Sequence, residues 1–244
     1  MGGLTGAIRP LATGFLLSLS PVVAFAIGSI TLLGATAVLR SVNPQAAVPQ
    51  TLAESSLVLR RVSFKTLGLL FLTGLGVAWG FRIMVGEVLP KVLPAEIPGV
   101  SKDLLMGLVF IVMAFSALLT GALAVKVGNT RSMILGLGAT AGFLELLLFI
   151  HNPILVAGIT IALVVSFSIV SNGAIPLALS LVPAQRGGLG IGIYFGGFSA
   201  AFSVFGFLFT PTSLTLPIAA FMGVAAFLSA GLCIAISSRF QMSK

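Results

Sequence analysis

Long apolar blocks dominate the chain, and short polar connections rich in Pro and Gly separate them. About 20 apolar residues, in a helix that rises about 1.5 Å per residue, cross a hydrocarbon core about 30 Å thick. The blocks are continuously apolar, without the period-two alternation of a membrane β-barrel. This pattern predicts an all-α polytopic membrane protein. The blocks span residues 11–39, 64–89, 103–125, 133–150, 154–181, 190–210 and 214–237.

The first block is too long for a single span, because one helix over residues 11–39 would extend about 43 Å. Ser20-Pro21 is a natural turn in its middle, since a proline disfavours helix in the residue before it. We therefore expect two helices that meet at this turn. The first, over residues 1–19, is only a partial span, whereas the second, over residues 22–39, is just long enough to cross.

Residues 40–63 form the longest polar connection and divide the chain into a short N-terminal part, 1–39, and a six-helix domain, 64–244. Within this connection, Thr51 and Glu54 have the spacing of a capping box, which predicts a short helix starting at Thr51. That helix either lies on the membrane surface or is a solvated linker.

Composition and charge narrow the possible partners. The chain is 58% hydrophobic and 7% charged, whereas soluble domains carry about 25% charged residues. The lipid bilayer is therefore the expected partner. The net charge of +8 could indicate nucleic acid, but the basic residues are scattered between apolar blocks, so no nucleic-acid partner is expected.

The scattered basic residues predict the orientation, because short basic loops stay in the cytoplasm. Alternating spans from the loop at 40–63 place the C-terminus in the cytoplasm, and we expect a plasma (inner) membrane location. On the opposite side, Lys91 and Lys102 are offset by acidic neighbours. The predicted cytoplasmic residues are Arg40, Arg60, Arg61, Lys65, Lys126, Arg131, Arg186, Arg239 and Lys244.

One connection carries a motif. The sequence Gly121-Ala-Leu-Ala-Val-Lys126-Val-Gly128-Asn-Thr-Arg131 resembles the cytoplasmic loop motif of the major facilitator superfamily, Gly-x-Leu-x-Asp-Arg-x-Gly-Arg-Arg. Val125 stands where the motif has its Asp, and Arg131 falls one residue past its last basic position. The matching residues are Gly121, Leu123, Lys126 and Gly128.

A second stretch resembles Gly-Pro-x-x-Gly-Gly-x-Leu, which occurs in the fifth helix of drug/proton antiporters of that superfamily. Pro10, Gly14 and Leu16 align with it, while Arg9 and Thr13 replace glycines. If both matches are used to number the spans as in that superfamily, the chain contains the end of helix five followed by helices six to twelve. The resemblance therefore implies the six-helix C-terminal half of a major facilitator fold plus one and a half helices of the N-terminal half.

The resemblance implies secondary active transport of a small organic solute, as proton-coupled efflux by alternating access. The chain is then either a truncated or split form, or the missing N-terminal half is a partner chain.

No enzyme activity, cofactor or metal is expected, because the spans hold no acid/base pair, nucleophile constellation or metal cluster. The alternative is a non-transporting pigment or lipid carrier, or assembly protein, of the same fold, in which Glu145 or His151 would ligate a cofactor.

Candidate substrate residues lie on helices that line the path in this family. Trp79 and Arg82 lie in the 64–89 helix, and Arg82 either binds an anionic substrate group or snorkels to the headgroups. Glu87 is five residues further, about 140° round an α-helix. The two side chains therefore need not pair, and we expect Glu87 at the interface. Tyr194, in the 190–210 helix, is a further candidate for substrate contact.

Ser168 and Asn172 share one face of the 154–181 helix. Pro176 has no amide hydrogen, so it leaves the carbonyl of Asn172 without its helical partner. A kinked helix with free polar groups suits substrate binding. A hinge or a packing seam is the other interpretation, and both could hold.

Glu145 is the candidate proton-coupling group. Counted from Met133, it lies about 18 Å along its helix, near the middle of the membrane. Gly138 and Gly142 share its stripe, and because small residues mark close helix contact, we expect Glu145 to face protein. A structural hydrogen bond between helices is the alternative role.

Glycines at four-residue spacing also occur at Gly76 and Gly80, and at Gly192 and Gly196. We interpret them as helix contacts rather than as a phosphate loop, since no Lys-Ser/Thr follows them. His151 is the lone histidine, and an interfacial or capping role is expected for it.

Overall fold

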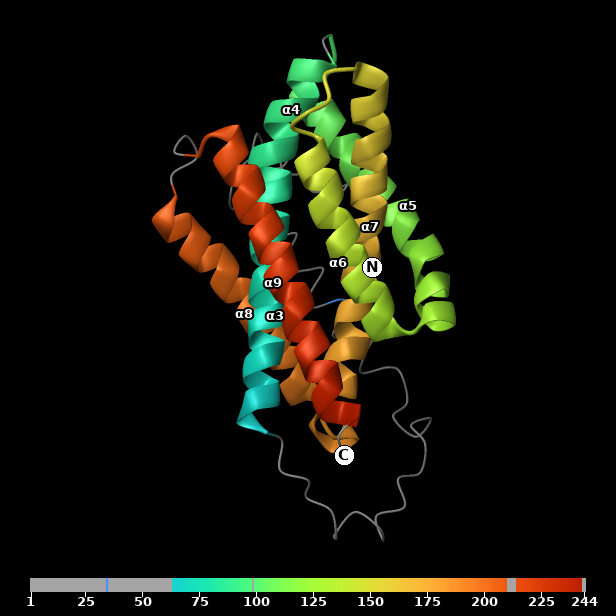
Figure 1. Cartoon of the computed structure of the whole chain (residues 1–244), viewed down its shortest axis with the longest axis vertical. Helices are drawn as coiled ribbons and strands as arrows, with labels where there is room; N and C mark the ends of the chain where they lie inside the picture. Colours follow the sequence, from blue (N-terminus) through green and yellow to red (C-terminus); the bar gives the residue numbers. More distant parts are fainter. Residues whose placement is uncertain (1–33, 35–62, 98, 210–213, 243–244) are drawn as a thin grey trace, which may run out of the picture. The chain divides into compact units, whose positions relative to one another are not determined.

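The computed structural model describes residues 34, 63–97, 99–209 and 214–242, and the structural statements below refer to these residues (Figure 1). The chain divides into two compact units, one of residues 8–61 and one of residues 62–244 with 1–7. Apart from Gly34, the described residues belong to the second unit. Several predictions lie outside the described residues: the helices at 1–19 and 22–39, the capping box of Thr51 and Glu54, and the helix-five match at Pro10 and Gly14.

The described residues form an all-helical bundle without strands. A continuous helix combines α3, the π-helical turn η2 and α4, so that the bundle has six helices. Five of these, all except α6, are long and apolar enough to cross a membrane. The predicted class, an all-α multi-pass membrane protein, is confirmed at this level. The elements are α3 (Phe64–Ile83), η2 (Met84–Val88), α4 (Leu89–Glu96), α5 (Lys102–Val127), α6 (Asn129–Leu146), α7 (Pro153–Ser180), the 3-10 turn η3 (Ala184–Arg186), α8 (Gly187–Leu208) and α9 (Leu216–Met242).

The first helix is longer than its predicted range of 64–89, because it continues through Pro90 to Glu96. Pro90 has no amide hydrogen, and in an α-helix its ring would clash with the carbonyl four residues earlier. The wider turn η2 precedes it, and there the amide of Leu89 donates to the carbonyl of Met84, five residues back. This change of hydrogen bonding lets the helix pass a proline without ending.

Helix α6 is displaced from its predicted range of 133–150. Gly128 alone connects it to α5, with a φ of 93° that favours glycine, so α6 already begins at Asn129. It ends at Leu146, and Asn152 then caps α7, its Oδ1 accepting from the amides of Ile154 and Leu155. Asn129, Arg131 and Glu145 make α6 less apolar than the other helices. It nevertheless packs between α7 and α9.

The helices pair in a pattern that repeats (Figure 1). Helix α3 packs on α8 and α9, helix α7 packs on α5 and α6, and α6 packs on α9. Exchanging α3 with α7, α5 with α8 and α6 with α9 reproduces the same pairs. The two groups of three are α3, α5, α6 and α7, α8, α9. Successive helices alternate in direction, so two helices that are exchanged, which stand three apart in the order, run in opposite directions. The bundle therefore consists of two similarly packed, inverted groups.

Glycines bring α3 and α8 into close contact at two reciprocal points. The Cα of Gly74 lies against the backbone carbonyl of Tyr194, and that of Gly197 lies against the carbonyl of Phe71. A side chain at either position would overlap a backbone oxygen of the facing helix. This contact therefore depends on glycine at both points.

The two predicted glycine pairs behave differently. Gly76 and Gly80 lie against α9, so the predicted helix contact is confirmed. Gly192 and Gly196 have open space where a side chain would lie, so the predicted contact is wrong at those residues. They lie on the opposite side of α8 from the face that packs on α3, so a four-residue spacing alone did not identify the packed face.

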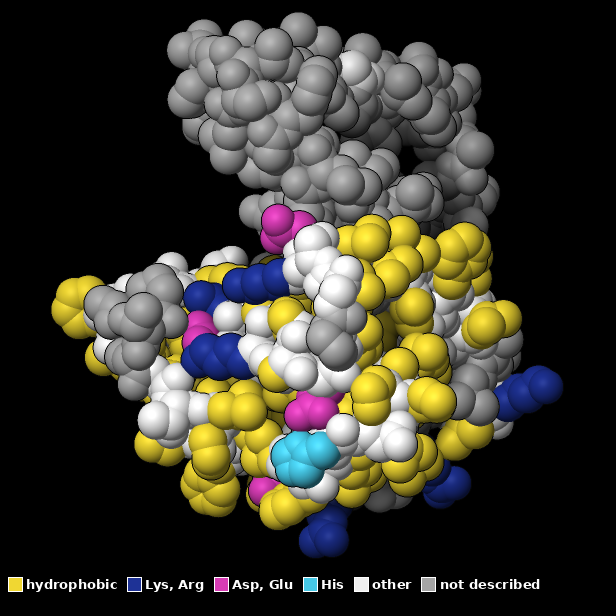
Figure 2. All heavy atoms as spheres, turned by 90° about the horizontal axis from the view of Figure 1, so that it is seen from above, with side chains coloured by type: hydrophobic (Ala, Val, Ile, Leu, Met, Phe, Trp, Pro, Cys, Tyr) yellow, Lys and Arg dark blue, Asp and Glu magenta, His cyan; other side chains and the backbone are white. Residues whose placement is uncertain are grey.

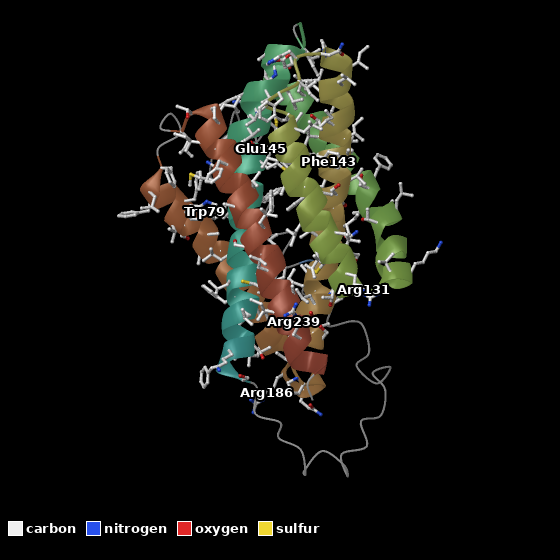
Figure 3. All side chains as sticks on the ribbon, in the orientation of Figure 1. Trp79, Arg131, Phe143, Glu145, Arg186 and Arg239 are labelled. Carbon is white, nitrogen blue, oxygen red and sulfur yellow. The ribbon has the colours of Figure 1, made fainter. Side chains whose placement is uncertain are left out.

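Charged residues separate toward the two ends of the bundle. The end where α3 begins, here called the basic end, has basic but no acidic residues in the described part of the chain: Lys65, Lys126, Arg131, Arg186 and Arg239. Arg131, Arg186 and Arg239 lie toward this end in Figure 3, with Glu145 toward the other. The opposite, acidic end carries Glu87, Glu96, Asp103 and Glu145. This distribution matches the expected loop charges, while the orientation in the membrane stays a prediction.

Candidate functional site

Three charged side chains meet near the acidic end of the long first helix. Glu87, in η2, has a side chain that is 5% exposed. Its Oε1 lies 3.6 Å from Nη1 of Arg82, and its Oε2 accepts a hydrogen bond of 3.2 Å from Nζ of Lys91. Lys91 also donates to the carbonyl of Leu214, before α9, at 2.8 Å. We call Arg82, Glu87 and Lys91 the charge triad.

The triad corrects the prediction for Glu87. The expected angle of about 140° from Arg82 assumed α-helical geometry. Because η2 is a π turn, with hydrogen bonds between residues five apart, Arg82 and Glu87 lie on one face and pair. Glu87 is also buried between two cations rather than interfacial.

The guanidinium of Arg82 contacts one aromatic ring, which packs against two others. Its Cζ lies 4.8 Å from the centroid of the Phe205 ring, a cation–π contact. The Trp79 ring lies edge-on to Phe205 and to Phe209, at centroid distances of 5.4 and 6.2 Å. We call Trp79, Phe205 and Phe209 the aromatic box. Two predicted substrate residues, Trp79 and Arg82, therefore lie together where α3 meets α8.

The triad carries an excess positive charge. Two cations share one carboxylate, and among the described residues no other acidic side chain forms an ion pair with either cation. Glu96, the nearest acidic residue along the chain, instead lies 3.1 Å from Nδ1 of His151. Figure 2 shows basic and acidic side chains gathered among apolar ones on this end of the molecule.

Ser168 and Asn172 face α5 rather than the charge triad. Ser168 donates to the carbonyl of Met113 at 3.4 Å. Asn172 donates to the carbonyl of Ala117 at 2.7 Å and to the Thr120 hydroxyl at 2.8 Å. Both side chains thus hold α7 against α5. This contact is the packing seam that was one of the two interpretations of these residues from sequence. Their role in substrate binding stays a prediction.

Sequence reasoning missed Asn129, the first residue of α6. Its Nδ2 donates to the carbonyl of Gly173 in α7 at 3.0 Å, next to Asn172. The amides of Asn129 and Asn172 therefore tie α5, α6 and α7 together one turn before Pro176. Asn129 lies within the loop motif, but the motif directed attention to its basic residues and glycines.

Tyr194 lies apart from both groups. It is 2% exposed and packs with Leu70, Ala174 and Ala178 in a small apolar cluster between α3, α7 and α8. The predicted substrate residues thus occupy three places in the bundle: the charge triad with its aromatic box, the seam between α5 and α7, and this cluster. They do not form one site.

Glu145 is not near the middle of its helix. It lies in the last turn of α6 and is half-buried, and within the described ranges its carboxylate makes no hydrogen bond or ion pair. Gly138 and Gly142 have open space beside them, so the predicted helix contact along that stripe is wrong. The displacement of α6 explains why Glu145 lies in the last turn, whereas the packed face contains Gly136 and Leu137 rather than the stripe of Gly138 and Gly142. Proton coupling by Glu145 stays a prediction.

No known protein family, curated protein or solved structure matches this chain. The resemblance to the major facilitator superfamily therefore rests on the sequence motifs alone.

The loop motif covers the end of α5, the turn and the start of α6. Gly121 and Leu123 lie in α5, and Gly128 is the turn itself. Lys126 and Arg131 are exposed on either side of it. The structure explains why a glycine stands at position 128 of the motif, because its positive φ permits a turn of one residue.

Proposed function

We propose that this protein is a secondary transporter of small organic solutes, built like the C-terminal half of a major facilitator. The observation that carries this proposal is the inverted pairing of α3, α5 and α6 with α7, α8 and α9. Inverted groups of three helices within a six-helix half are typical of that superfamily. The loop motif between α5 and α6 supports the same assignment.

The irregular helices support transport as well. Helices α3 and α7, which exchange under the inverted pairing, each carry a local irregularity: η2 follows α3, while α7 continues as one α-helix past Pro176, which removes one backbone hydrogen bond. Transporters place substrate sites where interrupted helices of the two repeats meet, because broken turns free backbone groups and allow bending. A rigid membrane anchor would gain nothing from these two irregularities.

Alternating access needs two bundles that move against one another. The described helices supply one of them, and we propose that an N-terminal half, on the same or on a partner chain, supplies the other. We further propose that the complex lies in the plasma membrane with the basic end in the cytoplasm, as the positive-inside rule requires.

Transport is tested with the full chain in liposomes, together with any chain that co-purifies with it. A pH-sensitive dye inside reports proton movement when each member of a panel of aromatic carboxylates, amines and neutral amides is added. We expect at least one solute to move protons, and Glu145→Gln to abolish proton movement while solute movement persists. If no solute moves and the purified protein carries a bound pigment or lipid, the carrier hypothesis replaces transport.

A further inference from the structure

We propose that the charge triad and the aromatic box together bind an aromatic monocarboxylate. The proposal deepens the proposed function, because it identifies this class of anion as the transported solute. Four features of the site lead to it: the exposure of the charges, the free donors of Arg82, the net charge and the rings.

The triad presents its cations and hides its anion. The side chains of Arg82 and Lys91 are 31% and 38% exposed, whereas that of Glu87 is 5% exposed. A ligand that reaches this place therefore meets positive charge. An amine would need the carboxylate of Glu87, which both cations already occupy.

The guanidinium of Arg82 has donors to spare. Its ion pair with Glu87, at 3.6 Å, is longer than a hydrogen bond, and in the described part of the chain Arg82 donates no hydrogen bond at all. A guanidinium offers five N–H donors in a planar fork that matches both oxygens of a carboxylate. Gly86 lies directly against this group and leaves it room to fold along the helix.

The net charge selects a monoanion. Two cations and one carboxylate leave one positive charge without a partner among the described residues. At a half-buried place beside the apolar bundle, an uncompensated charge is costly. One added carboxylate neutralises the site, whereas a dianion would reverse its charge.

The rings select an aromatic body. Phe205 lies under the guanidinium, and Trp79 and Phe209 stand beside it. Phe205 is 1% exposed, so an aromatic ring attached to the carboxylate would contact the half-buried Trp79 and Phe209 edge-on or offset while its acid group reaches Arg82. The site thus combines a charge contact with an apolar surface on facing helices.

Binding of radiolabelled benzoate, benzamide and benzylamine to the purified full chain tests this site, since the three probes share a ring and differ in charge. We expect only benzoate to bind. Arg82→Gln should weaken benzoate binding at least about tenfold, which is the effect of one charge-assisted hydrogen bond. Lys102→Gln, at an exposed cation outside the triad, should leave binding unchanged.

Glu87→Gln gives the sharpest outcome. Removing the resident counter-ion while keeping its shape should strengthen benzoate binding, whereas a purely structural triad predicts no gain. If Arg82→Gln does not fold, Arg82→Lys replaces it, and the loss of the fork should weaken binding. Benzylamine binding that Glu87→Gln abolishes, or benzoate binding that both Arg82 variants leave unchanged, overturns the proposal.

The two proposals can fail separately. If benzoate binds with the expected dependence on Arg82 and Glu87 but enters the liposomes no faster than it enters protein-free liposomes, the site stands and transport fails. If other solutes cross while benzoate does not bind, transport stands and this site is wrong.

Discussion

Glu87 and Arg82 are partners because of one change in backbone hydrogen bonding. In an α-helix, residues five apart point in different directions. The turn η2, with its bond from the Leu89 amide to the Met84 carbonyl, brings them onto one face. Pro90 is the local cause, since it has no amide hydrogen to continue the α-helical ladder. A single proline thus decides which charged side chains meet.

Gly128 is a residue where substitution should be poorly tolerated for conformational reasons. Its φ of 93° is costly for any other residue, so Gly128→Ala should lower stability by about 1 to 3 kcal/mol. Gly138→Ala is the control, because that glycine is helical and has open space beside it. Thermal unfolding in detergent measures both. Equal melting temperatures for Gly128→Ala and the wild type would contradict this role.

Among the elements, α7 is held by side-chain amides as well as by packing. Asn172 joins it to α5 and Asn129 joins it to α6, both close to Pro176. Helices in a membrane gain little from the hydrophobic effect between them, so hydrogen bonds and close packing hold them together. The seam therefore sets the position of α7 close to Pro176.

Asn172→Ala tests the seam. The loss of its bonds to Ala117 and Thr120 should destabilise the protein by about 0.6 to 1.7 kcal/mol, the range for hydrogen bonds between membrane helices. Ser171→Ala, at the exposed neighbouring residue, should have little effect on the melting temperature. If Asn172→Ala keeps the wild-type melting temperature yet loses solute binding, Asn172 is a substrate residue rather than a structural one.

Two adjacent glycines in α8 offer a matched pair. Gly197 lies against the Phe71 carbonyl, while Gly196 faces open space. Gly197→Ala should force α3 and α8 apart and cost about 1 to 3 kcal/mol, the effect of overpacking a close contact. Gly196→Ala should be tolerated. The melting temperatures of the two variants in detergent compare them directly, and an equal loss in both would contradict the observed face.

At the scale of the whole molecule, two patterns coincide. The helices pair as inverted groups, and the end where α3 begins and α9 ends carries five of the eight basic residues of the described part and none of its acidic residues. The first pattern suits a bundle that can adopt more than one arrangement. The second suits an orientation set by the positive-inside rule.

The orientation is tested by fusing reporters to the C-terminus. Because α9 ends at the basic end, we expect green fluorescent protein to fluoresce in the cytoplasm and alkaline phosphatase to stay inactive there. An active phosphatase fusion would place the basic end outside. Fusions in the connection between α6 and α7 should give the opposite result, which controls for expression.

Some elements could be predicted closely from sequence and others could not. The apolar run of 154–181 became α7 at Pro153–Ser180, since Asn152 and Pro153 mark its start in the sequence itself. The helix predicted at 133–150 was displaced to Asn129–Leu146. Its first turn is polar, so hydropathy placed the start too late. The burial of Glu87 was also missed, because helical periodicity presupposes α-helical geometry throughout.

The amino-acid sequence by itself determined that this is an all-α membrane protein with an excess of basic residues at one end, because length, hydropathy and charge are local properties. Only the tertiary structure decided which glycines are in contact, that Asn172 binds α5, and that Arg82, Glu87 and Lys91 meet beside three aromatic rings. The glycine contacts, the bonds of Asn172 and the rings of α8 beside Arg82 depend on which faces of distant helices pack together, and neither spacing nor hydropathy specifies the facing helix. The meeting of the three charged side chains depends on the π turn η2, which helical periodicity does not predict.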